Sequence, residues 1–204
     1  MFKFFYKKAE NIDKKPIYEE ILNSLKDPEY RLEFIEHYSL PGFGEYEYNI
    51  LTGKEDKNLR EADELLNLIT KFKSDEKEIE NIDKYLKDKR ALELINSFEY
   101  LYFRFNTYEE DALIGVATKL MKLGSNVETV KLGILLTQYF DLESKSEAKK
   151  VVFQLGEYPD FTYYSLLALK PTNMYYGALE DYLKTTFDYG ELIVREMEGK
   201  DGTR

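Results

Sequence analysis

The chain has 204 residues and a mass of 24.2 kDa, the size of one domain, with enough chain to bury a core without covalent cross-links. Its hydrophobic content of 43% and charged content of 33% exclude collagen-like, mucin-like and fully disordered classes. The absence of cysteine excludes disulfides, thiolate metal sites and cysteine nucleophiles, and the single histidine, His37, excludes a multi-histidine metal site.

The net charge of −10 bears on the kind of partner. Proteins that bind the phosphate backbone generically need a positive surface, so this charge disfavours direct nucleic-acid binding. It favours a basic protein partner instead. The sequence holds neither a glycine-rich phosphate-binding loop nor a calcium-binding loop, and we expect no cofactor and no metal.

The first eight residues, Met1–Lys8, combine aromatic residues with lysines. Their apolar run is too short for a secretory signal or a membrane span, and no later run reaches about eighteen apolar residues. We expect a segment that packs on the first helices, with contact to a membrane surface or to another chain as alternatives. We also expect a cytoplasmic protein without a membrane span.

Helix signals begin at Pro16, which suits a first helical position and is followed by apolar residues at helical spacing. This pattern predicts a helix over 16–25. Asp27 and Pro28 repeat the arrangement and predict a second short helix, which ends before residue 40. Residues 40–57 alternate polar and apolar side chains among glycines, which predicts an irregular, ordered loop, with a short strand inside it as an alternative.

The helical period returns at Asn58, a candidate N-cap, and predicts a helix over 58–72. The charged stretch 74–89 carries few apolar residues, which indicates a solvated helix with a narrow apolar stripe. Residues 91–105 are rich in apolar side chains and predict a strong helix.

Three Ser/Thr-x-x-Glu boxes predict helix starts in the second half of the chain, at Thr107, Ser125 and Ser144, which are 18 and 19 residues apart. Gly124 and Gly156 stand where the preceding helices should end. The boxes therefore predict a regular succession of short helices.

Two further acids, Asp160 and Asp188, are candidate N-caps toward the C-terminus. Gly115 and Gly133 fall inside predicted helices, where glycine costs about 1 kcal/mol relative to alanine unless close packing compensates. We therefore expect helices that approach one another closely at these positions.

One helix and its turn in every 16 to 19 residues gives a two-helix unit of about 37 residues, between tetratricopeptide repeats and HEAT or armadillo repeats. The segments 126–136 and 153–169 resemble HEAT-type repeats, and the likeness extends over about residues 107–170. The stretch lacks the regular proline and the Asp/Arg ladder of better HEAT repeats. The resemblance implies a curved α-solenoid used as a protein-binding surface, and it implies no activity.

The predicted fold is all-α, with stacked antiparallel helical hairpins in a single domain over 1–204. Residues 1–57 should hold the N-terminal helices and the irregular loop at 40–57. Residues 58–198 should hold the stacked hairpins.

Tyrosine is the most informative residue type, because the chain has 18 tyrosines and no tryptophan. A tyrosine ring buries area at low rotamer cost while its hydroxyl stays polar, and interfaces are enriched in it. One pair stands beside glutamates in the predicted loop, and another stands near the C-terminus. The predicted protein-binding residues are Glu45, Tyr46, Glu47, Tyr48, Tyr175 and Tyr176, with packing in the core as the alternative.

These features favour a non-enzymatic protein-binding module, in the form of an acidic inhibitor or immunity-type protein that occludes a basic partner such as a nuclease. An acid-catalysed hydrolase that uses paired carboxylates and a structural or oligomer-forming protein are the alternatives. Adjacent acids such as Glu109, Glu110 and Asp111 point in different directions on a helix, which argues against paired catalysis there. The oligomeric state stays open.

Overall fold

The computed structural model describes residues 15–24, 26, 58–105, 109–187 and 189–201. These residues form ten α-helices and four 3₁₀ turns, and they contain no strand, so the all-α prediction is confirmed. The second predicted helix, the irregular loop at 40–57 and His37 lie outside the described residues. The helices are α1 (Ile17–Ser24), α3 (Leu59–Phe72), α4 (Ile79–Tyr85), α5 (Ala91–Phe105), α6 (Glu110–Leu123), α7 (Val127–Leu136), α8 (Ser146–Leu155), α9 (Pro159–Leu169), α10 (Tyr175–Thr185) and α11 (Tyr189–Asp201).

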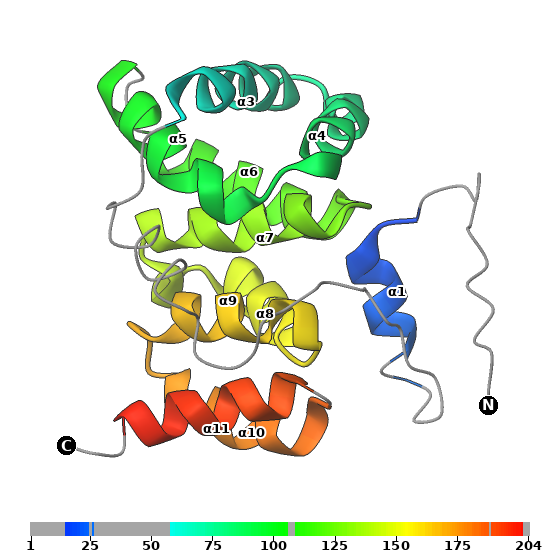
Figure 1. Cartoon of the computed structure of the whole chain (residues 1–204), viewed down its shortest axis with the longest axis vertical. Helices are drawn as coiled ribbons and strands as arrows, with labels where there is room; N and C mark the ends of the chain where they lie inside the picture. Colours follow the sequence, from blue (N-terminus) through cyan, green and yellow to red (C-terminus); the bar gives the residue numbers. More distant parts are fainter. Residues whose placement is uncertain (1–14, 25, 27–57, 106–108, 188, 202–204) are drawn as a thin grey trace.

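From α3 onward, helices that follow one another in the chain lie beside one another along the long axis of the molecule, and α1 lies at the side of this succession (Figure 1). The helices α3, α4 and α5 occupy one end, α6 and α7 come next, then α8 and α9, and α10 with α11 form the other end. Contacts run along this order, from α5 to α7, from α7 to α9 and from α9 to α11.

The helices α7 and α9 lie at the centre of the core. Every residue of α7 from Glu128 to Leu136 is buried, and α9 is buried at all but one of its positions, Leu167. A helix that is buried around its whole circumference lies inside the structure, and its neighbours cover it on several sides. The helices α5 and α6 cover α7, while α8, α10 and α11 cover α9.

Predictions that rest on local capping signals agree with the structure in the first half of the described chain. The helix α3 begins after Asn58, whose Oδ1 accepts the Glu61 backbone N–H at 3.3 Å. The helix α5 has the predicted bounds.

The stretch 74–89 does not form the single helix that the sequence predicts. Two 3₁₀ turns flank the seven-residue α4, whose Ile82 is fully buried against the core.

The three capping boxes do not mark the helix starts that the sequence predicts. Thr107 lies outside the described residues, and α6 begins after Glu109. The Ser125 N–H and hydroxyl both donate to Asp83, so Asn126 becomes the N-cap of α7. The Ser144 hydroxyl donates to the Asp141 carbonyl and ends a 3₁₀ turn, so α8 begins only at residue 146.

Predictions that rest on glycine and proline agree with the structure better than those that rest on the capping boxes. Gly124 and Gly156 are the C-caps of α6 and α8, as predicted. Pro159 is the first residue of α9, and the N-cap is Tyr158. The prediction that Asp160 caps this helix is wrong, because Asp160 lies buried inside its first turn.

Candidate functional site

The structure describes two of the six predicted binding residues. Glu45, Tyr46, Glu47 and Tyr48 lie outside the described residues. Tyr175 and Tyr176 are the first two residues of α10, and their rings meet edge to face at a centroid distance of 5.4 Å. Successive helical residues point about 100° apart, so one ring enters the core and the other faces solvent. The Tyr175 side chain is 3% exposed, whereas Tyr176 is 70% exposed.

Tyr176 lies on the solvent face of α10 together with two acids. Glu180, four residues along the same face, is exposed, and so is Asp181. The Asp181 carboxylate contacts the Lys184 ammonium at 3.6 Å, and both side chains are more than half exposed. We call Tyr176, Glu180 and Asp181 the α10 face.

A third carboxylate reaches this region from the turn between α8 and α9. Glu157 is half-buried, and its pKa is raised, first by burial and then by the nearby negative charge of Asp181. The two carboxylates therefore repel each other. A cation placed beside them relieves this repulsion, so the region favours positively charged groups.

The α10 face rests on a rigid support. Tyr182, on the opposite side of α10, is fully buried and donates a hydrogen bond of 2.8 Å to the Phe153 carbonyl. Burial raises the pKa of its hydroxyl, and the charges of Glu157 and Asp181 raise it further. The ring passes directly over Gly156, where a Cβ atom would overlap the Tyr182 side chain. Tyr176 is therefore presented on a helix that is fixed to α8.

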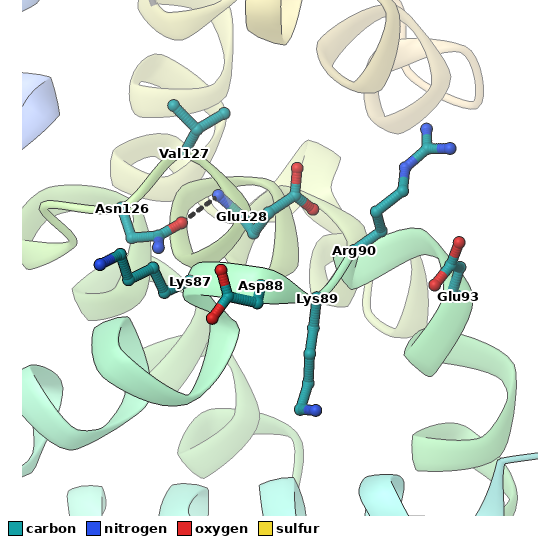
Figure 2. Close-up of a pocket in the computed structure, with 8 residues that line it drawn as sticks. All are labelled: Lys87, Asp88, Lys89, Arg90, Glu93, Asn126, Val127 and Glu128. Carbon is teal, nitrogen blue, oxygen red and sulfur yellow. Dashed lines mark hydrogen bonds between the residues drawn. The ribbon is translucent and has the colours of Figure 1, made fainter. Parts of the chain in front are cut away.

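A polar pocket of about 630 Å³ opens at the junction of α5 and α7 (Figure 2). Its eight lining residues include cations, acids and one amide: Lys87, Asp88, Lys89, Arg90, Glu93, Asn126, Val127 and Glu128. The three cationic side chains point in three different directions (Figure 2). They do not converge on a shared centre as the groups of a binding site do.

The polar groups of this pocket serve the fold. The Lys89 ammonium contacts the Glu61 carboxylate at 3.0 Å and lies 5.0 Å from the centre of the Tyr85 ring. Glu128 Oε2 accepts the Ala91 backbone N–H at 2.7 Å, and its Oε1 lies 3.2 Å from the ammonium of buried Lys131. The contacts of Lys89 join the segment before α5 to α3, and those of Glu128 join α7 to the start of α5.

The acids considered for paired catalysis lie at the start of α6. Glu109 is its N-cap, and the Lys145 ammonium lies 3.8 Å from Glu110 and 3.6 Å from Asp111. Acids in a first helical turn also complement the helix dipole. Within the described ranges, no group of three or more His, Cys, Asp or Glu side chains is arranged to hold a metal ion.

Sequence reasoning missed a second exposed aromatic group. Phe103, on α5, is 42% exposed and meets the Tyr139 ring edge to face at 5.6 Å. The Tyr139 hydroxyl donates to Glu99 at 3.4 Å, and its pKa is raised by burial and then by the charge of Glu99. The signal was present, because a helix with aromatic residues on all its faces must expose some of them.

No protein-family model, no curated protein and no solved structure matches this chain. Among the helices that the structure describes, none combines the length and the apolar character needed to cross a lipid bilayer.

Proposed function

We propose that this protein is a non-enzymatic protein-binding module whose α10 face contacts a basic partner protein. One observation carries the proposal: a tyrosine that is 70% exposed stands on a helix that also exposes two carboxylates, Glu180 one turn further along the same side and Asp181 farther round the solvent-facing surface. Exposed tyrosines that a partner can desolvate often dominate binding energy. Flanking charges of one sign select a partner of the other sign and speed its approach.

The partner that fits this face carries arginine or lysine side chains around an apolar recess. The recess accepts the Tyr176 ring, and the cations lie over Glu180, Asp181 and Glu157. Basic enzymes that act on nucleic acids typically have these features. This supports the narrower proposal that the chain is an inhibitor or immunity-type protein. The residues Glu45, Tyr46, Glu47 and Tyr48 remain predicted contacts outside the described part of the chain.

We also propose that the helical pairs form a HEAT-like solenoid of short units in a cytoplasmic protein. The pairs α6–α7, α8–α9 and α10–α11 begin at residues 110, 146 and 175, and each pair contacts the next. These spacings of 36 and 29 residues are shorter than the roughly 40 to 47 residues of HEAT repeats. An extended stack of this kind offers broad surfaces for protein binding.

The test is affinity capture from a lysate of the source cell with three forms of the tagged protein: wild type, Tyr176→Ala and Phe103→Ala. Phe103→Ala is the matched control, because it removes another exposed aromatic ring, from α5, which lies at the opposite end of the succession of helices from α10 (Figure 1). We expect one basic protein to be captured by wild type and by Phe103→Ala, and its affinity to fall about tenfold or more in Tyr176→Ala.

Two results would contradict the proposal. One is capture of the partner by Tyr176→Ala with undiminished affinity, which would show that the α10 face is not the contact. The other is a partner that is acidic or neutral, which would remove the electrostatic basis of the proposal.

A further inference from the structure

The helix α1 is attached to the rest of the molecule by contacts with residues distant in the sequence. It packs on α6 and α8, at the side of the succession of helices (Figure 1). Residues 27–57, outside the described part of the chain, separate it from α3. We call the part of α6 and α8 that α1 covers the α1-binding surface.

Apolar anchors account for the middle of the contact. Ile17 and Ile21 are spaced one helical turn apart and are buried, as is the ring of Tyr18 between them. The exposed side of α1 carries polar residues such as Glu19 and Asn23. This division is the pattern by which an amphipathic helix binds an apolar surface on another protein.

Polar contacts fix the two ends of α1. At its start the Ile17 N–H donates to the Gly124 carbonyl at 2.9 Å. The Tyr18 hydroxyl donates to Gln154 Oε1 at 2.6 Å. At its end the Ser24 and Tyr158 hydroxyls form a hydrogen bond in the buried region. A helix of the same sequence in a separate peptide could make all of these contacts.

The core does not depend on α1 for its continuity. The helices packed on α7 and α9 include α5, α6, α8, α10 and α11, and these form one connected body. An isolated helix of eight residues is unstable in water, so α1 holds its helical form through this contact. An element that packs on the core along only one short helix can open locally before the core unfolds.

We propose that α1 undocks from α6 and α8 as a unit while α3–α11 stays folded, and that the uncovered α1-binding surface then binds a helical peptide with the α1 pattern. The chain's own α1 is the resident occupant and competes with any such peptide. The occupant must present isoleucines one turn apart, a tyrosine after the first, and a serine at the end. This proposal is independent of the α10 face.

The first test is amide hydrogen exchange on the full chain. Undocking as a unit predicts that the amides of α1 exchange at least about a hundredfold faster than those of α7 and α9, and that they exchange at similar rates to one another. Equal protection of α1 and α7 would mean that α1 opens only with the whole molecule, which would overturn the proposal.

The second test uses the Ile21→Asp variant of the full chain, labelled with ¹⁵N, and an unlabelled peptide of residues 15–24. We expect α7 to retain protected amides in the variant, and millimolar peptide to shift the amide resonances of Gly124, Gln154 and Tyr158. The same peptide carrying Ile21→Asp is the control and should shift none of them. Two outcomes would overturn the proposal. One is unfolding of the variant's core, and the other is a folded variant whose amide resonances do not shift when the wild-type peptide is added.

Discussion

A single glycine makes a close approach between α6 and α7 possible. A Cβ atom at Gly133 of α7 would lie 2.9 Å from both the carbonyl oxygen of Ala117 and the backbone nitrogen of Met121 on α6. Backbone atoms cannot yield as the end of a flexible side chain can. The position therefore requires glycine for packing, although the residue lowers helix propensity.

The substitution Gly133→Ala should destabilise the protein by about 1–3 kcal/mol, because α6 and α7 must move apart. The expected close approach at Gly115 of α6 is wrong, because a Cβ there meets no described atom within 4 Å apart from its chain neighbours and its own helix backbone. Gly115→Ala is therefore the matched control. It should stabilise the protein by up to about 1 kcal/mol through helix propensity. Urea unfolding of both variants measures these changes. A stabilising Gly133→Ala would contradict the close packing.

The raised pKa of Glu157 makes a prediction about pH. A carboxyl group whose pKa is higher in the folded state than in the unfolded state binds its proton more tightly when folded. Its ionisation therefore lowers the free energy of unfolding as pH rises through the unfolded value near 4.5 toward the folded value. Glu157→Gln should match wild type at acidic pH and be more stable than wild type at pH 7.

The measurement is the free energy of unfolding of wild type and Glu157→Gln at several pH values, with Glu180→Gln as an exposed control. In addition, Asp181→Asn should lower the pKa of Glu157 in a carbon NMR titration, because it removes the neighbouring charge. A Glu157→Gln variant whose advantage over wild type shrinks as pH rises would have the wrong sign for this account.

At the scale of elements, buried charges join helices that the sequence alone does not place together. Lys131 of α7 is 0% exposed, contacts Glu128 at 3.2 Å and lies 5.0 Å from the centre of the Tyr164 ring of α9. Glu128 in turn accepts the first N–H of α5. This short chain of contacts connects α5, α7 and α9.

The losses of stability on removing the two charges should not be additive. Lys131→Met removes the ammonium that contacts the Glu128 carboxylate inside the core, and we expect a loss of about 3 kcal/mol of stability. The double variant Glu128→Gln/Lys131→Met should lose less than the sum of the two single losses, by about 1–3 kcal/mol. Chemical unfolding of the four proteins gives this coupling, and additive losses would contradict the pair's role.

The same elements show which parts of the fold the sequence could predict. The helices α3 and α5 were predictable because a local cap and an apolar period specify them. The start of α7 was not, because Asp83, which lies 42 residues before Ser125, accepts that residue's N–H and hydroxyl. A contact over that separation leaves no periodic signal in either segment.

In the candidate site, too, the sequence could predict some features and not others. Two adjacent tyrosines at 175 and 176 could be singled out by type and by their place near the C-terminus. The sequence could not assign one to the core and one to solvent, because that depends on where α9 and α11 pack against α10. The repulsion between Glu157 and Asp181 likewise arises only when the α8–α9 turn meets α10.

For the whole molecule, the net charge of −10 sets the long-range field that a partner meets. Such a field raises the association rate of a basic protein and is screened by salt, since the Debye length falls from about 30 Å at 0.01 M to about 8 Å at 0.15 M. Contacts of the Tyr176 ring act at short range and should govern the dissociation rate instead.

The central claim is that the α10 face recognises a basic protein, and the most direct measurement is the association rate of the captured partner at low and high salt. We expect the wild-type rate to fall about tenfold or more between 0.01 M and 0.5 M salt, and Glu180→Gln/Asp181→Asn to show a lower rate and a weaker salt dependence. A wild-type rate that does not change with salt, or a double variant that associates as wild type does, would contradict the claim.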